Sequence, residues 1–305
     1  MRTERGFALI VVLLVMAIVG VIGAEFSYSM RLEATAVRAY KDGILARHLA
    51  EAAFAQAVRE IVADSRYVAY DEHGLLTFYT QDRLPLPQLP REKVDFEGGQ
   101  YSYRITDEEA RVNLNTSAPE RVDRLLQFCL GLDKSVRDVI GDSLQDWRDA
   151  NEEHRLNGAE SEDYYLKLPV PYRSKNGNLD TVGELLQVRG FTPKLMDGVD
   201  GKRGLAAFVT VKGSQQGTVN INTASHEVLR ALNVGEAMFT SIEQTRRQAP
   251  YTTNPGVQGA AFSSRTFRIE AQGLIDGHVR ARLTAVVQKR QDNTGVVVLE
   301  WSGIR

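Results

Sequence analysis

The feature that most constrains this chain is an uncharged apolar run from Phe7 to Ala24, FALIVVLLVMAIVGVIGA. As an α-helix, these residues extend about 27 Å at ~1.5 Å per residue, close to the ~30 Å hydrocarbon core of a bilayer. A helix also pairs its own backbone amides, which lipid cannot do. Arg2 and Arg5 precede the run, and basic residues on a short leading segment favour its retention in the cytoplasm. The sequence therefore predicts one membrane-spanning helix, with a cytoplasmic N-terminus and the bulk of the chain on the far side.

The helix is expected to continue beyond the bilayer. No proline occurs between Glu25 and Ala63, alanine is frequent, and apolar residues recur at helical spacing. Uncapped helical patterns much longer than about 25 residues are typical of membrane spans and coiled coils. The pattern predicts a single helix over residues 7–63, half in lipid and half packed on a head domain.

The start of the apolar run carries a second signal. Arg5-Gly6-Phe7 resembles the leader of type IV prepilins, which a prepilin peptidase cuts after the glycine on the cytoplasmic side. Cleavage between Gly6 and Phe7, followed by N-methylation of Phe7, would leave the whole apolar helix on the mature protein. A secretory signal cleaved near Gly20 to Ala24 is the alternative, although the apolar core is long for that class.

An internal repeat lies in the second half of the chain. Residues 112–120 read VNLNTSAPE and residues 219–227 read VNINTASHE. Each copy predicts a short extended piece that enters a helix capped by Ser or Thr, and Ser117 and Glu120 have capping-box spacing. Helical patterns follow at 122–130 and 229–247, with short turns near residues 131–133, 190–192 and 235–237. These features predict two copies of a small α-helical unit of the SAM-like or helix-hairpin-helix kind.

Strand signals flank the repeats. The segments 99–105, 264–274, 278–290 and 296–301 predict strands, and Asp276-Gly277 is a hairpin signal.

The V-N-[LI]-N-T pair, the segment Asp146-Trp147-Arg148-Asp149, Asn157-Gly158-Ala159-Glu160 and Tyr164-Tyr165 together resemble the type II secretion system protein K family. The resemblance implies an α+β fold with a pilin-like long N-terminal helix, an antiparallel sheet and inserted α-helical SAM-like repeats. The expected ranges are 1–6 for the prepilin leader, 7–63 for the transmembrane and stalk helix, 64–106 for the first part of the pilin-like core, 107–211 and 212–260 for the α-helical repeats, and 261–305 for the closing strands.

The same resemblance implies a function and a set of partners. Members are minor pseudopilins that sit at the tip of the pseudopilus and assist export of folded proteins from the periplasm. Val11 stands where typical pilins carry a glutamate, and this family has an apolar residue there too. The implied location is the bacterial inner membrane, with a periplasmic C-terminal domain. The implied partners are other minor pseudopilins, the prepilin peptidase, the inner-membrane assembly platform, and the outer-membrane channel or secreted cargo.

Seven acidic residues occur between Asp146 and Asp163, opposed by Arg148 and Arg155. Calcium prefers six to eight oxygen ligands, and the spacing does not match an EF-hand. A solvated acidic loop is the plain alternative, while the resemblance implies calcium in the α-helical region. The expected ligands are Asp146, Asp149, Glu153 and Asp163, in a structural rather than a catalytic site.

Catalysis and nucleic-acid binding are the competing functions. The five histidines show no metal-ligand spacing, and no nucleotide-binding or nucleophile-elbow motif is present. The chain has 37 basic and 39 acidic residues, without the basic surplus of a nucleic-acid binder. The turns at Gly131, Gly190 and Gly235 lack the second glycine of DNA-binding hairpins. We therefore expect no enzyme and no nucleic-acid partner, and a competence-type DNA-binding pseudopilin stays as the alternative.

Overall fold

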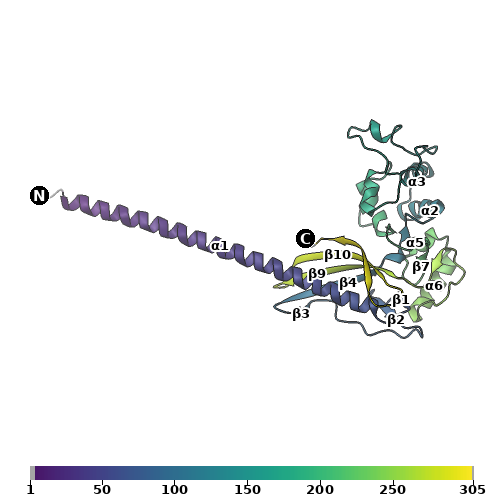
Figure 1. Cartoon of the computed structure of the whole chain (residues 1–305), viewed down its shortest axis with the longest axis horizontal. Coiled ribbons are helices and arrows are strands. Elements are labelled where there is room, and N and C mark those ends of the chain that lie inside the picture. The colour runs from purple at the N-terminus through teal and green to yellow at the C-terminus, as the bar shows by residue number, and fades with distance from the viewer. Residues whose placement is uncertain (1–3, 304–305) are drawn as a thin grey trace.

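The computed structural model describes residues 4–303, with side chains from residue 7 onward. It confirms the single long N-terminal helix, because α1 runs from Glu4 to Val62 without a break. Every residue from Phe7 to Lys41 is exposed, and Figure 1 shows this half of α1 projecting away from the rest of the molecule. Residues 1–3 of the expected leader lie outside the described residues.

The C-terminal half of α1 packs on an antiparallel sheet of strand order β11-β10-β9-β4-β3. The strands are β3 (Val94–Phe96), β4 (Gly99–Asp107), β9 (Thr266–Ile275), β10 (His278–Lys289) and β11 (Val296–Ser302). A separate hairpin consists of β1 (Tyr67–Tyr70) and β2 (Leu76–Tyr79). All four predicted strands are therefore confirmed. Asp276 and Gly277 have φ values of 51° and 74° and form the tight turn between β9 and β10, as predicted.

Small residues allow α1 to lie close to the sheet. Ala46, Ala50, Ala53 and Ala57 are fully buried on one face of the helix. Opposite them, a Cβ atom added at Gly273 would overlap the carbonyl oxygen of Ala46. This close approach explains why alanine, and not leucine, dominates the buried face of α1.

A buried ion pair fixes the end of α1 to the same core. Arg91 donates from Nε and Nη2 to the two carboxylate oxygens of Glu60, at 3.0 and 2.6 Å. The hydroxyl of Tyr103 donates to Glu60 Oε1 at 2.5 Å. Both charged side chains are 5% exposed, so each depends on the other for its burial.

A large α-helical region is inserted between β4 and β9, two strands that pair with each other. Figure 1 shows it at the end of the sheet away from the N-terminus. Its helices are α2 (Pro119–Leu130), α3 (Lys134–Arg148), α4 (Pro193–Asp197), α5 (His226–Ala231) and α6 (Glu236–Gln248). Its short strands form two parallel pairs, β5 (Val112–Asn113) with β6 (Val209–Thr210), and β7 (Val219–Asn220) with β8 (Ala260–Ala261). The 3-10 helices are η1 (Glu108–Ala110), η2 (Tyr165–Lys167), η3 (Val182–Gln187) and η4 (Leu205–Ala207).

The repeated V-N-x-N-T motif makes the same contacts in both copies. The first asparagine of each copy, Asn113 or Asn220, accepts a hydrogen bond from the backbone of the second, Asn115 or Asn222. The amide of the second asparagine then joins two distant segments of its own unit. Asn115 bonds the backbone at Leu179 and Val211, and Asn222 bonds the backbone at Tyr251 and Phe262. The repeat in sequence is thus a repeat in structure, while the narrower assignment to the SAM-like class stays a prediction.

The predicted capping box was wrong. The N-cap of α2 is Ala118 without a side-chain cap, and Pro119 begins the helix, so Ser117 and Glu120 form no capping box. Proline suits the first helical position because it has no N–H to satisfy. The helical pattern over 229–247 is not continuous. It divides into α5 and α6 at the turn predicted near Gly235, where Asn233 adopts a φ of 64° and Gly235 caps α6.

Candidate functional site

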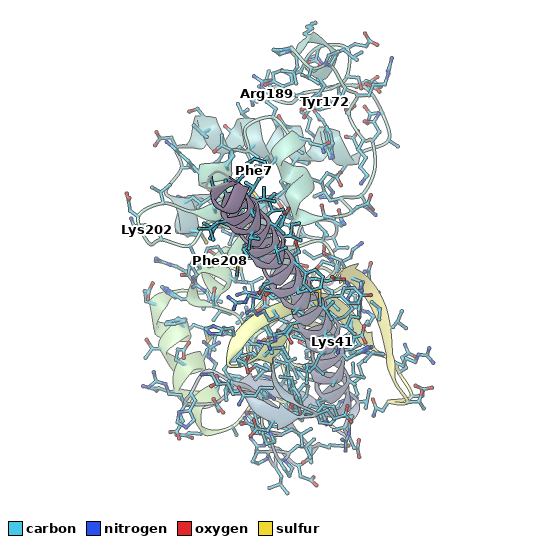
Figure 2. The ribbon with its side chains drawn as sticks, turned by 90° about the vertical axis from the view of Figure 1, so that its left-hand side faces the viewer. Phe7, Lys41, Tyr172, Arg189, Lys202 and Phe208 are labelled. Carbon is cyan, nitrogen blue, oxygen red and sulfur yellow. The ribbon has the colours of Figure 1, made fainter. Side chains whose placement is uncertain are left out.

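The exposed half of α1 is the first candidate site. It is the one helix, among the residues described, that is long and apolar enough to cross a membrane. Phe7 is 71% exposed and Val11 is 41% exposed, and Figure 2, which looks along α1, shows Phe7 at the near end. Among the described residues up to 303, no side chain covers this surface, so its apolar residues are available to lipid or to other helices.

The acidic segment after α3 is the second candidate site, and one arginine organises it. Asp146 is fully buried and accepts a hydrogen bond from the backbone N–H of Ala159 at 2.9 Å. Nη1 of Arg155 lies 2.6 Å from a carboxylate oxygen of Asp146 and 2.6 Å from one of Asp149. The hydrogen bonds to Asp149 and Asp146 raise the pKa of Arg155. A single guanidinium thus bridges both carboxylates, and its one positive charge offsets only one of their two negative charges.

The structure does not gather the four expected calcium ligands at one centre. Asp146 and Asp149 lie together, but Glu153 is exposed, and Asp163 accepts a hydrogen bond from the backbone of Glu160 at 2.9 Å. Within residues 4–303, no group of three or more His, Cys, Asp and Glu side chains is arranged to hold a metal ion.

Two buried side-chain oxygens in this segment, which the sequence analysis did not single out, have the chemistry of metal ligands. Oε1 of Glu160 and Oδ1 of Asn176 are buried and have no hydrogen-bond partner in the described structure. Glu160 is 1% exposed, and its pKa is raised by burial and by the charges of Asp146, Glu152 and Asp149. The amide of Asn176 donates to Glu152 at 3.1 Å. Unpaired buried oxygens beside several carboxylates are a donor set that suits a hard cation. Only the return of the chain brings Asn176 to this place, so spacing could not reveal it.

Two of the three hairpin turns, those at Gly131 and Gly235, do not present a favourable phosphate site. Gly131, with a φ of 63°, ends α2, and Asp133 is the N-cap of α3. Gly235 is the N-cap of α6, and Glu236 is its first residue. A carboxylate therefore stands at the N-terminus of both following helices, where it would repel a phosphate group.

Three consecutive acids, Asp107, Glu108 and Glu109, join the inserted region to the sheet. Asp107 accepts hydrogen bonds from Asn220, Thr223 and Ser264 at 2.8, 2.5 and 2.6 Å.

The next two acids bind β9. Glu108 is fully buried and makes a bidentate pair with Arg268, at 3.0 and 2.8 Å. Glu109 accepts from the backbone of Arg265 and Thr266, and burial together with the charge of Asp107 raises its pKa to about 7. The sequence analysis missed this joint, because its partners lie more than 100 residues away in the chain.

A membrane-length helix whose second half packs on an antiparallel sheet defines a pilin-like protein, here with a large α-helical insertion. The model of the type II secretion system protein K family matches residues 102–200, from β4 through the acidic segment to α4. A type II secretion system protein K of Pseudomonas aeruginosa is 30% identical over 76% of this chain and 68% of its own length. That of Pectobacterium carotovorum is 27% identical over 71% of this chain and 74% of its own.

A solved structure supports the same fold. A chain of the GspK-GspI-GspJ complex from the type 2 secretion system of enterotoxigenic Escherichia coli aligns with a TM-score of 0.62 over 89% of this chain and 99% of that chain, at 16% identity. This chain belongs to the type II secretion system protein K family. The predicted α+β class with a long N-terminal helix and an antiparallel sheet is confirmed, and the DNA-binding alternative gains no support from these relatives.

Proposed function

We propose that this protein is a minor pseudopilin at the tip of the type II secretion pseudopilus, where it assists pseudopilus assembly and the export of folded proteins from the periplasm. The main support for this proposal is the shape of the molecule, which has an exposed apolar helix at one end and a bulky inserted region at the other. The helix suits lateral packing with other pseudopilin helices. The insertion extends beyond the far end of the sheet, and a body of that size fits best where no further subunit is added above it.

The local chemistry of α1 supports the same position. Pilin subunits are expected to pair a glutamate of the membrane helix with the N-terminal amine of a neighbour, and Val11 offers no carboxylate for such a pair. Gly20 and Gly23 have open space around them, which permits close approach of another helix. The partners proposed for this helix are the equivalents of GspI and GspJ, the proteins that accompany GspK in the solved complex.

The proposal includes processing and topology. A prepilin peptidase would cut between Gly6 and Phe7 on the cytoplasmic side, and Phe7 would then be N-methylated. The mature chain would cross the inner membrane once, reach the assembly platform through α1 and expose the head domain to the periplasm, where the outer-membrane channel or cargo could meet it. The role is structural, without catalysis.

Intact mass and N-terminal sequencing of the protein from membranes, with and without the peptidase, test the processing. Gly6→Val is expected to leave the chain uncut. Gly20→Val, the same change in open space within the same helix, is expected to mature normally. Immunogold labelling of sheared pseudopili then tests the position. A label at one end supports the tip, and repeated labelling along the filament would contradict it.

We further propose that the acidic segment binds Ca²⁺. Of the four expected ligands, Asp146 and Asp149 would take part, with Glu160, Glu152 and Asn176 in place of Glu153 and Asp163. The unpaired oxygens of Glu160 and Asn176 support this set. Calcium would neutralise the clustered carboxylates and fold the segment.

Thermal unfolding of the full chain in detergent, with calcium or with a chelator, tests the site. Calcium is expected to raise the unfolding temperature of the wild type and of Glu162→Gln, whose side chain is 77% exposed. It should have little effect on Glu160→Gln. An equal response of all three proteins would place calcium elsewhere, and no response in any would remove the site.

A further inference from the structure

A groove of about 560 Å³ opens on the inserted region, between the C-terminal end of α2 and the segment from α4 to Arg203. Its lining is largely apolar and includes Phe128, Leu132 and Val199. Phe128 is 43% exposed and Val199 is 49% exposed. Large apolar side chains that share an open groove are costly in water unless another surface covers them.

The rim of the groove carries one sign of charge. Lys194, Lys202 and Arg203 line it, and no aspartate or glutamate does. Arg203 pairs with Glu227 at 3.1 Å and lies over the ring of Phe208 at 4.9 Å. Neither lysine makes an ion pair with a carboxylate of residues 7–303. Figure 2 shows Lys202 at the outer left edge of the molecule. The charges of the two lysines are therefore available to an acidic group, while that of Arg203 is already paired with Glu227.

The loop that carries Lys202 and Arg203 is closely packed at its base. Gly198 adopts a φ of 87°, and a Cβ there would overlap the carbonyl oxygen of Lys202. A Cβ at Gly204 would overlap the backbone at Met196 and Gly198. The two ends of the 198–204 loop are thus pressed together, and Gly204 N–H donates to the Asp197 carbonyl at 3.3 Å.

We propose that this groove binds a segment of a partner protein that presents an apolar side chain flanked by carboxylates. The apolar floor receives the side chain, and the lysines receive the acids. The inference goes beyond the proposed function, because the groove needs no particular position in the pseudopilus. A nucleic acid fits the same rim less well, since phosphates gain nothing from an aliphatic floor and Phe128 is the only aromatic ring in the lining.

Selection of short random peptides displayed on phage, against the full chain in lipid nanodiscs, tests the proposal. The wild type is expected to enrich peptides in which leucine or phenylalanine stands beside aspartate or glutamate. A doubly charge-reversed variant, Lys194→Glu with Lys202→Glu, should bind those peptides about tenfold more weakly and select basic peptides instead. Both lysines are exposed, so the variant is expected to fold, and its thermal unfolding checks this.

Two further variants test whether the peptides bind in the groove itself. Lys167→Glu with Lys212→Glu changes the net charge equally outside the groove and should keep the wild-type preference. Val199→Asp should lose the enriched peptides by placing a charge in the apolar lining of the groove. Selection of no peptide above empty nanodiscs, or the same peptides from the charge-reversed variant, would overturn the proposal. So would tight binding of duplex DNA at physiological salt that the charge-reversed variant loses.

Discussion

Asn222→Ala removes a side chain that is 1% exposed and whose amide holds two distant backbone segments. Its Nδ2 donates to the carbonyls of Tyr251 and Phe262 at 3.0 and 2.9 Å, and its Oδ1 accepts from the Tyr251 N–H at 2.7 Å. Alanine leaves these three partly buried backbone groups without their side-chain partner. At about 1 kcal/mol or more for each, the inserted region should lose ~3 kcal/mol of unfolding free energy. With a shift of about 2–4 °C per kcal/mol, the unfolding temperature should fall by roughly 6–12 °C.

The other copy of the motif supplies an internal comparison. Asn115 makes the equivalent bonds but is only partly buried, so water can replace some of them. Asn115→Ala should therefore cost about 1–2 kcal/mol. Asn178→Ala, at an exposed position, should stay within about 0.5 kcal/mol of the wild type.

Urea unfolding of the full chain in detergent micelles measures these values. The chain has two tryptophans, Trp147 in the core of the inserted region and Trp301 in the sheet. A Trp301→Phe background leaves Trp147 to report on the region that contains both motifs. If Asn222→Ala behaves like Asn178→Ala, or less severely than Asn115→Ala, the structural explanation of the repeat is wrong.

Three further predictions concern the sheet and its joint to the insertion. The pKa of the Glu109 carboxyl is raised to about 7 in the folded protein, above the value of about 4.5 that it has in the unfolded chain. Protonated Glu109 therefore stabilises the fold at low pH. This contribution is lost as the pH rises from about 4.5 through 7. Glu109→Gln should flatten that part of a pH–stability profile, and an unchanged profile would refute the assignment. Gly273→Ala should destabilise the core by about 1–3 kcal/mol or more through overlap with Ala46, measured by thermal unfolding against Gly295→Ala in open space. Arg91→Met should lower the free energy of unfolding by about 3–5 kcal/mol, because it leaves the Glu60 carboxylate buried without its ion-pair partner. Adding Glu60→Gln should recover part of this loss. If urea titrations show no recovery, the unpaired charge is not the cause.

In the acidic segment, the spacing of residues in the sequence predicts only part of the candidate metal site. Asp146 and Asp149 are three residues apart at the end of α3, so helical geometry predicts that they lie together, and they do. From the sequence, Arg155 is only a basic residue among the acids, whereas in the structure it bridges Asp146 and Asp149. Glu160 and Asn176 gain their importance from burial and from a missing hydrogen-bond partner. Neither property is visible until the chain has folded back on itself.

The sequence by itself determined the long helix, the strands with their hairpin turn, and the existence of two similar units, because each depends on a local pattern: apolar length, alternation, or a repeated motif. Only the tertiary structure determined which of these elements contact one another. It showed that the asparagines of the motif bond to residues up to 113 positions away in the chain, and that Asp107, Glu108 and Glu109 fasten the insertion to β9. It also joined residues of α2 and of the 198–204 loop into one groove. These arrangements depend on burial and on contacts between distant residues, which packing creates and no local pattern encodes.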